Sequence, residues 1–172
     1  QLKEITSRND EGDLMLDMIG RNVNRINQLV SDLLNSTRFE QLEYQPANIQ
    51  DVLDEALVLA GDRIELKHIR VEKEYEKNIC EIMVDKDKIR LAFLNIIVNA
   101  IEAMESDSGV LKIKTSKQEN KCLVEFIDNG TGMDEETLQR LFEPYFTKKI
   151  KGNGLGLTNT QNIILNHKGN IN

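Results

Sequence analysis

The sequence predicts an α+β fold in which a long helix of a helical bundle precedes a two-layer α/β sandwich, with helices on one mixed sheet. Two patterns indicate this organisation. Between residues 13 and 41, apolar residues recur at alternating spacings of three and four, which is typical of a helix that packs in a bundle. From residue 49 onward, helical periodicity alternates with stretches in which every second residue is apolar, so both helices and strands are expected. We place the domain boundary between residues 44 and 45.

The composition is that of a folded, acidic chain. With 172 residues, 40% of them hydrophobic, the chain can bury a proper core. The net charge of -7 and the lack of a basic face argue against a nucleic-acid partner. Cys80 and Cys122 lie in alternating apolar runs, so we expect buried, reduced thiols. No signal peptide or long apolar run is present, so we expect a cytoplasmic segment, with membrane contact only through regions outside this chain.

The first expected element is a helix from about Asp13 to about Gln41. Its apolar seam consists of Leu16, Ile19, Val23, Ile26, Val30 and Leu33, and Leu29 and Leu34 widen it. A lone helix cannot bury such a stripe, so a partner is implied. Packing against its own domain is the alternative. The length of the seam and its position ahead of Pro46 favour an interaction module.

The next elements follow from caps and breakers. Tyr44 to Ala47 is expected to be a linker, because Pro46 opposes a helix. Asn48 can cap a helix from Ile49 to about Lys67, and Asp85 can cap another from Asp87 to about Glu105. Strands are expected over residues 69–75 and 79–84.

The second half of the chain contains the expected hairpin and two more helices. Residues 110–115 and 121–127 should form the hairpin, with Asn120 near its turn. Asp134 can cap a short helix to Arg140. The last helix should run from Leu155 to Leu165, and a strand should begin after Gly169.

Two glycine-containing stretches indicate a ligand. Asp128-Asn-Gly-Thr-Gly-Met133 follows a predicted strand, so the carboxylate of Asp128 can accept a hydrogen bond from an amino group, and the glycines let a flat ligand approach the backbone. Gly152-Asn-Gly-Leu-Gly-Leu157 runs into a predicted helix, whose first N–H groups can bind phosphates. A base amino group and phosphates together suggest ATP. For either stretch alone, simple turns are an equal alternative.

A polar stripe on the helix at residues 87–105 favours the ligand. Asn95, Asn99 and Glu102 fall on one face of this otherwise apolar helix. Unpaired buried amides are costly, so the stripe needs partners. A hydrated metal ion that bridges phosphates would supply them.

Four motifs in order resemble the N, G1, F and G2 boxes of sensor histidine kinases, members of the GHKL ATPase superfamily: Asn95-x-x-x-Asn99-Ala, Asp128-x-Gly-x-Gly, Phe142-Glu-Pro-x-Phe and Gly152-x-Gly-Leu-Gly-Leu. The resemblance covers almost the whole chain. It implies the GHKL fold, ATP and Mg²⁺ as cofactors, and phosphoryl transfer to a histidine for relay to the aspartate of a response-regulator receiver domain. It also implies a homodimer joined by a dimeric four-helix bundle, because residues 1–44 are similar to the second helix of the dimerisation and phosphotransfer hairpin.

The resemblance implies an ATP-binding set, with Asn99 also holding the metal: Asn95, Asn99, Asp128, Gly130, Gly132, Met133, Phe142, Thr147, Lys148, Lys149, Gly152, Gly154, Leu155, Gly156 and Leu157. The short connection before the glycines is similar to that of the short-lid subgroup, in which Lys149 matches the family's lysine and Lys148 replaces a usual threonine. We expect residues 147–153 to be a lid that is mobile without nucleotide and ordered by it. A solvated surface loop is the alternative.

The phosphate-accepting histidine of the family is expected outside this chain. Neither His68 nor His167 is followed by the Glu and Pro of the acceptor box, so both are expected to be structural, and this chain alone should not autophosphorylate. In hydrolases of the superfamily, a glutamate one turn before the metal-binding asparagine activates water. Asn95 stands there and cannot act as a base at neutral pH. We expect a supporting role for Glu102. The resemblance also implies two further strands after the end of this chain.

Two other functions remain open. One is an ATP-responsive interaction module, or a degenerate kinase that controls a partner without phosphorylating it. The other is a serine-protein kinase of the anti-sigma type, which the heptad helix disfavours. Residues upstream of Gln1 would discriminate the first of these from an active histidine kinase.

Overall fold

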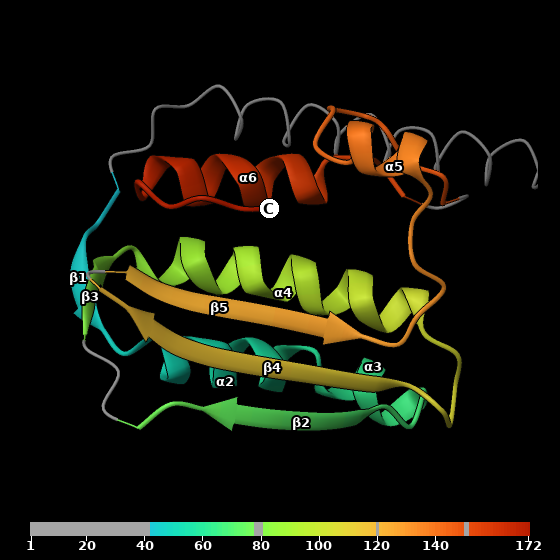
Figure 1. Cartoon of the computed structure of the whole chain (residues 1–172), viewed down its shortest axis with the longest axis horizontal. Helices are drawn as coiled ribbons and strands as arrows, with labels where there is room; N and C mark the ends of the chain where they lie inside the picture. Colours follow the sequence, from blue (N-terminus) through green and yellow to red (C-terminus); the bar gives the residue numbers. More distant parts are fainter. Residues whose placement is uncertain (1–41, 78–80, 120, 150–151) are drawn as a thin grey trace, which may run out of the picture. The chain divides into compact units, whose positions relative to one another are not determined.

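The computed structural model describes residues 42–77, 81–119, 121–149 and 152–172 (Figure 1). The predicted bundle helix over residues 13–41 lies outside these ranges, as do Cys80 and Asn120. Within them, helices pack on a three-stranded sheet in two layers, which confirms the predicted α+β class. None of the described helices is both long and apolar enough to cross a lipid bilayer.

The three-stranded sheet is mixed, as expected. β2 (Arg70–Tyr75) runs parallel to β4 (Val110–Gln118), and β4 runs antiparallel to β5 (Lys121–Asp128). The register pairs Leu111 with Asp128, which places the aspartate at the end of the hairpin. Alternate residues of β4, including Leu111 and Ile113, are fully buried, because they point toward the helix layer.

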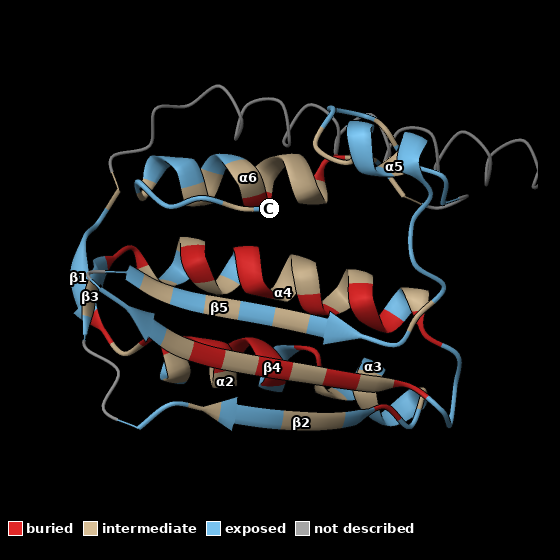
Figure 2. Ribbon diagram, in the orientation of Figure 1, coloured by how far each residue is buried: buried red, intermediate tan, exposed pale blue. Residues whose placement is uncertain are grey.

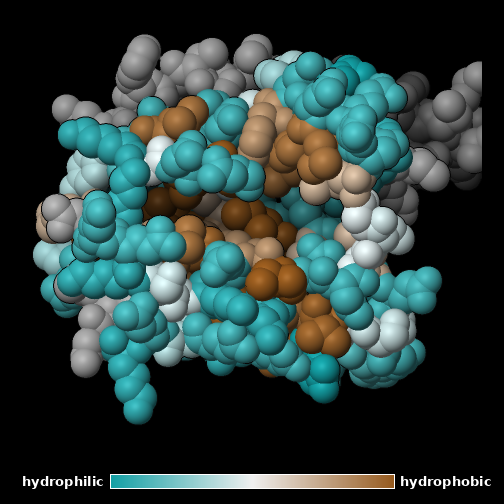
Figure 3. All heavy atoms as spheres, in the orientation of Figure 1, coloured by the Kyte–Doolittle hydropathy of each residue, from teal (hydrophilic) through white to brown (hydrophobic). Residues whose placement is uncertain are grey.

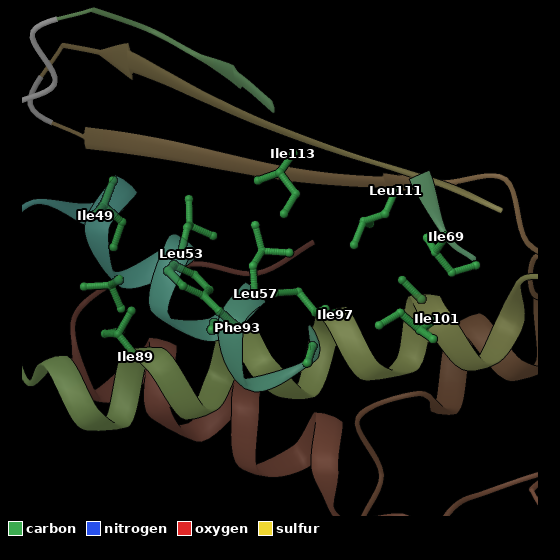
Figure 4. Close-up of a cluster of buried hydrophobic side chains, with 14 of the residues drawn as sticks. Ile49, Leu53, Leu57, Ile69, Ile89, Phe93, Ile97, Ile101, Leu111 and Ile113 are labelled. Carbon is green, nitrogen blue, oxygen red and sulfur yellow. The ribbon is translucent and has the colours of Figure 1, made fainter. Parts of the chain in front are cut away.

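Two capped helices lie against the sheet. α2 (Ile49–Leu59) begins at Asn48, whose side chain accepts from Gln50 N, and α4 (Lys86–Ala103) begins at Asp85, whose side chain accepts from Lys88 N. Both caps confirm the sequence-based expectation. The buried residues of these helices and of the sheet meet in one core (Figures 2 and 4), whose largest fully buried apolar side chains are Leu53, Ile97, Ile101, Leu111, Ile113 and Val52.

The predicted helix over residues 49–67 is in fact two helices, so that expectation was wrong. α2 ends at Leu59 and α3 (Gly61–Leu66) follows directly. Ala60 N–H donates to the carbonyls of both Ala56 and Leu57, and glycine follows it, which costs about 1 kcal/mol in a helix interior. No residue of α3 is buried, so packing does not force the helix to continue.

Residues 44–47, expected to be a linker, include a short strand. β1 (Gln45–Ala47) pairs antiparallel with β3 (Ile82–Val84), and Pro46 lies opposite Met83. A proline lacks the backbone donor, but the outer position of a two-stranded ladder tolerates it.

Two further expectations were wrong: that Cys122 is buried, and that a strand begins after Gly169. The side chain of Cys122 is only half-buried, as are those of Val124 and Phe126 on the same face of β5. Within the described residues β5 pairs only with β4, and α6 (Gly156–Asn166) lies alongside α4 (Figure 1). Figure 3 shows apolar side chains in the hollow between α6 and β5. Residues 169–172 form no strand.

Candidate nucleotide-binding site

The end of α4, the loop after β5, and the N-terminus of α6 bring the predicted ligand residues to one side of the described fold (Figure 1). α5 (Glu135–Arg140) and the segment that follows it complete this region. The side chain of Asp134 caps α5 by accepting from Thr137 N, as the sequence predicts.

The loop after β5 is folded against the C-terminus of α4. Thr131 N donates to Ala103 O at 3.1 Å, and a Cβ at Gly130 would lie 2.8 Å from that same oxygen, so glycine is required there. Gly132 has a φ of +69° and open space around it. Asp128 Oδ1 accepts from Gly130 N at 2.9 Å, and the carboxylate and Met133 are exposed. The loop therefore presents an acceptor beside bare backbone.

Lys67 binds the C-terminal end of α4, to which this loop is bonded. Its Nζ donates to Ile101 O at 2.9 Å and to Met104 O at 2.8 Å, so an ammonium group satisfies the terminal carbonyls of α4. This role is not predictable from the sequence, because a lysine that binds the end of another helix has no distinguishing pattern.

Asn95 fixes the first turn of α6. Its Nδ2 donates to Gly156 O at 3.3 Å and to Thr160 Oγ1 at 3.4 Å, and Thr160 is fully buried. Among the residues that the structure describes, no side chain caps α6 at Leu155, so the N–H groups of its first turn are available to an anion. Thr160 was not among the residues predicted from the sequence, although a threonine one turn after a glycine stretch is a usable signal.

The segment before the lid is attached to the glycine stretch. Tyr145 N donates to Gly154 O at 3.0 Å, and Thr158 Oγ1 donates to Phe142 O at 3.1 Å. Gly154 has a φ of +68°, and a Cβ there would lie 2.5 Å from the carbonyl carbon of Tyr145. Both its conformation and its surroundings therefore require glycine.

The two lid lysines bind different partners. Lys148 Nζ contacts the two carboxylate oxygens of Asp134 at 2.7 and 3.0 Å. Together with hydrogen bonds from Thr137, it holds the pKa of Asp134 well below its ordinary value, so this carboxylate stays charged at any physiological pH. Lys149 Nζ donates to Asn99 Oδ1 at 2.7 Å and to the carboxylate of Glu102.

The structure therefore places most of the predicted residues in three groups. Asn95, Gly156 and Leu155 belong to the junction of α4 and α6, Asn99 and Lys149 to the lid contact, and Asp128, Gly130, Gly132 and Met133 to the loop after β5. Phe142 and Gly154 link the lid to α6, while Thr147 Oγ1 accepts from Lys149 N at 3.1 Å and lies against Gly152. Leu157 follows Gly156 in the first turn of α6 and is half-buried.

Both histidines have structural partners, as predicted. His167 Nδ1 donates to Ile163 O at 2.7 Å, and its Nε2 accepts from Asp85 N at 3.0 Å. His68 has a φ of +52° at the turn between α3 and β2, and its Nδ1 contacts Asp107.

Comparison with known proteins gives one family. Residues 84–172 match the model of histidine kinase-, DNA gyrase B-, and HSP90-like ATPases. The sensor histidine kinase ZraS of Klebsiella oxytoca is 30% identical over 168 residues, which cover 98% of this chain and 36% of that protein. Sporulation kinase A of Bacillus subtilis (strain 168) is 35% identical over 158 residues, 90% of this chain and 26% of that protein. The chain thus spans about a third or less of these relatives.

Solved structures of a histidine kinase have a fold similar to that of this chain. The nucleotide-free catalytic domain of the histidine kinase ThkA superposes with a TM-score of 0.67 at 29% identity, covering 73% of this chain and 82% of that chain. Histidine kinase ThkA in complex with the response regulator protein TrrA superposes with a TM-score of 0.72 at 26% identity, covering 88% of this chain and 43% of that chain.

Proposed function

Because the chain belongs to the family of histidine kinase-, DNA gyrase B-, and HSP90-like ATPases, we propose that residues 45–172 are the ATP-binding catalytic part of a sensor histidine kinase. The observation that carries this proposal is the position of Asn99. Its side-chain oxygen already holds a cationic group, the ammonium of Lys149, close to a helix whose first N–H groups have no side-chain cap. A cation and a set of N–H donors are what a metal-bound triphosphate requires.

The adenine amino group would donate to Asp128. Asp128 is the last residue of β5, and the loop that follows it is bonded to Ala103 O of α4. These two attachments define the position of the carboxylate. Gly130, Gly132 and Met133 would line the base, since the two glycines leave the backbone uncovered.

The phosphates would bind at the first turn of α6 and under the lid. Asn95 holds that turn against α4, so its N–H groups are pre-oriented before ATP arrives. Gly156 leaves the first residue of this turn without a side chain, and the nearest atoms to a Cβ there would belong to Asn95. Gly152 and Gly154 instead allow close packing against Thr147 and Tyr145. Thr147, Lys148 and Lys149 precede this stretch and would add a hydroxyl and two positive charges around the phosphates.

The residues present fit Mg²⁺. Asn99 Oδ1 is a neutral oxygen of the type that this hard cation binds, and its present partner is a cation. Asn99 would hold the metal, which would neutralise phosphate charge in the transition state. Asp85 and Asp134 are not candidates, because their carboxylates cap α4 and α5.

Transfer to a protein group fits this site better than rapid hydrolysis of ATP. General-base activation of water needs a titratable group, whereas Asn95 is an amide whose nitrogen donates to Gly156 O and Thr160. The acceptor would be a histidine outside this chain. The intact protein would be a homodimer through the helix over residues 13–41, and a response-regulator receiver domain would take the phosphoryl group. The complex of ThkA with TrrA supports that partner.

Autophosphorylation of the full-length protein tests this proposal. Incubation with Mg²⁺ and radiolabelled ATP should give an acid-labile, alkali-stable phosphoprotein, which is the signature of phosphohistidine. The Asn99→Ala variant should lose it, whereas Asn162→Ala, an exposed position of α6, should retain it. ATP binding without any labelled protein would favour the degenerate kinase instead, and an acid-stable product would favour a serine-protein kinase.

A further inference from the structure

The partners of Lys149 suggest a function for a residue outside the predicted set, Glu102. On α4, Asn99 and Glu102 are three residues apart and share a face, and the ammonium of Lys149 joins their oxygens. The preceding residue, Lys148, instead binds Asp134, which lies 14 positions earlier in the sequence. Of these two lysines, it is therefore Lys149 whose ammonium group binds Asn99, the metal-binding candidate.

An ammonium group and a metal ion cannot occupy this place together. Both are attracted by the same oxygens, and like charges at such a separation repel each other. The contact between Lys149 and Asn99 must therefore open before a metal ion can reach Asn99 Oδ1.

We propose that Lys149 and Mg²⁺ compete for the oxygens of Asn99 and Glu102, so that Glu102 is a positioning residue for whichever cation is present. Without nucleotide, Glu102 draws Lys149 to the metal position. With nucleotide, it faces the hydrated metal at Asn99. This inference rests on the proposed function, because it takes Asn99 as the metal-binding residue.

The strength of the ion pair suits a contact that must open. The side chains of Lys149 and Glu102 are each 45% exposed, so water screens their attraction. Exposed pairs of this kind change an equilibrium constant by at most about fivefold. Lys149 can therefore hold the position in the free protein without preventing the entry of a metal–nucleotide complex.

The test measures binding by calorimetry on the 172-residue chain, with Mg·ADP as the probe. ADP is chosen because it lacks the terminal phosphate, which Lys149 would contact after it leaves Asn99. We expect Lys149→Met to bind Mg·ADP about two- to fivefold more tightly than the parent, because the competing cation is gone. A lysine that only contacts phosphate would give the opposite change.

A double-mutant cycle identifies the part of Glu102. In the parent, Glu102→Gln removes a charge that favours the metal but also releases Lys149, so its two effects oppose each other. In Lys149→Met only the first effect remains. We therefore expect Glu102→Gln to weaken Mg·ADP binding more in the Lys149→Met background than in the parent.

A matched control uses another exposed lysine–glutamate pair. Lys112 Nζ lies 3.0 Å from Glu74 Oε1 on the sheet, and neither residue belongs to the site. Lys112→Met and Glu74→Gln change the net charge by the same amounts as the test variants. They should leave Mg·ADP affinity unchanged and show no coupling in it.

A nucleotide-free measurement separates this inference from the proposed function. Electron paramagnetic resonance with Mn²⁺ alone should show tighter binding to Lys149→Met than to the parent. A parent chain that binds no ADP would refute the proposed function, while the Mn²⁺ result would still decide the competition. Unchanged or weaker Mg·ADP binding by Lys149→Met, or equal effects of Glu102→Gln in both backgrounds, would overturn the inference.

Discussion

Two asparagines one turn apart on α4 use opposite ends of the same functional group. Asn95 donates through Nδ2 to α6, whereas Asn99 accepts through Oδ1 from the lid. A carboxamide offers both a donor and an acceptor, so residue type alone does not determine which one is used. In this structure the surrounding elements decide: Asn95 holds two helices together, and Asn99 presents an oxygen to a cation.

Replacement of Asp128 by asparagine should weaken ATP binding. A carboxylate only accepts hydrogen bonds, whereas an amide can present its donor end to the adenine amino group. The lost charge-assisted bond should cost on the order of 1.5–3 kcal/mol in binding free energy, measured by calorimetric titration. Asp62→Asn, an exposed position of α3, is the control. Equal affinity of Asp128→Asn and the parent would remove Asp128 from the site.

Removal of the Asn99 side chain should abolish most of the dependence of nucleotide affinity on Mg²⁺. The oxygen at Asn99 would be the only neutral carboxamide ligand that we assign to the metal, and a bond between a polar group and a charge contributes on the order of 1.5–3 kcal/mol. Calorimetry with and without Mg²⁺ on Asn99→Ala measures this dependence. The assignment fails if the two proteins respond to Mg²⁺ identically, and Asn162→Ala should behave as the parent does.

At the scale of elements, local chemistry was predictable and tertiary chemistry was not. The caps Asn48, Asp85 and Asp134 were found in the sequence, because each bonds to a backbone group two or three residues away. The break at Ala60 was not predicted, because it depends on the lack of packing that would hold the helix across Gly61. The pairing of β1 with β3 was not predicted either, because a distant partner strand decides it.

The same division holds for the site. Glycine positions were predictable from motif spacing, and the positive φ at Gly132 and Gly154 gives them a physical reason. The support by Lys67 and Thr160 and the contact of Lys149 with Glu102 join residues more than 30 positions apart. Apart from the position of Thr160 one turn after the glycine stretch, no local pattern indicates such contacts, and the structure is needed to show them.

The lid over residues 147–153 should gain protection from hydrogen exchange when ATP binds. Among its described residues the side chains of Lys148 and Lys149 are 54% and 45% exposed, so their contacts with α4 and Asp134 are screened and weak. Phosphates would give the lysines stronger partners and shift the population toward an ordered lid. Exchange measured by mass spectrometry with and without ATP tests this. Equal rates in both states would mean that the segment is an indifferent surface loop.

At the scale of the whole molecule, α4 connects the core to the site. One face of this helix carries Ile97 and Ile101 into the core with the sheet (Figure 4). Another face presents Asn95 to α6 and Asn99 to the lid. Asp85 caps the N-terminus of α4, and Lys67 binds the carbonyl groups at its C-terminus, so both ends of the helix are fixed. Stability of this layer therefore sets the geometry of the nucleotide site, and changes that loosen the sheet should weaken ligand binding as well.

Tyr75 is a link between sheet and helix whose contribution should depend on pH. Its hydroxyl donates to Asp54 Oδ1 at 2.8 Å, which joins β2 to α2. Burial and the neighbouring Asp54 carboxylate both raise the pKa of Tyr75 above its ordinary value. The folded state therefore keeps the phenol proton at a pH where the unfolded chain, whose tyrosines titrate near about 10, loses it.

The sign of the effect follows from this difference. Below about pH 10 the hydroxyl is protonated in both states and its bond stabilises the fold by about 1 kcal/mol. As the pH rises above about 10, ionisation favours the unfolded chain, so the stability that Tyr75 contributes is lost progressively. Urea unfolding from pH 8 to 11 should show that the parent is more stable than Tyr75→Phe at pH 8 and that this advantage shrinks above pH 10. Tyr145→Phe, at a side chain that is 52% exposed, should follow the parent throughout. A constant difference between the parent and Tyr75→Phe over this range would show that the tyrosine titrates equally in both states, which would contradict a pKa raised by folding.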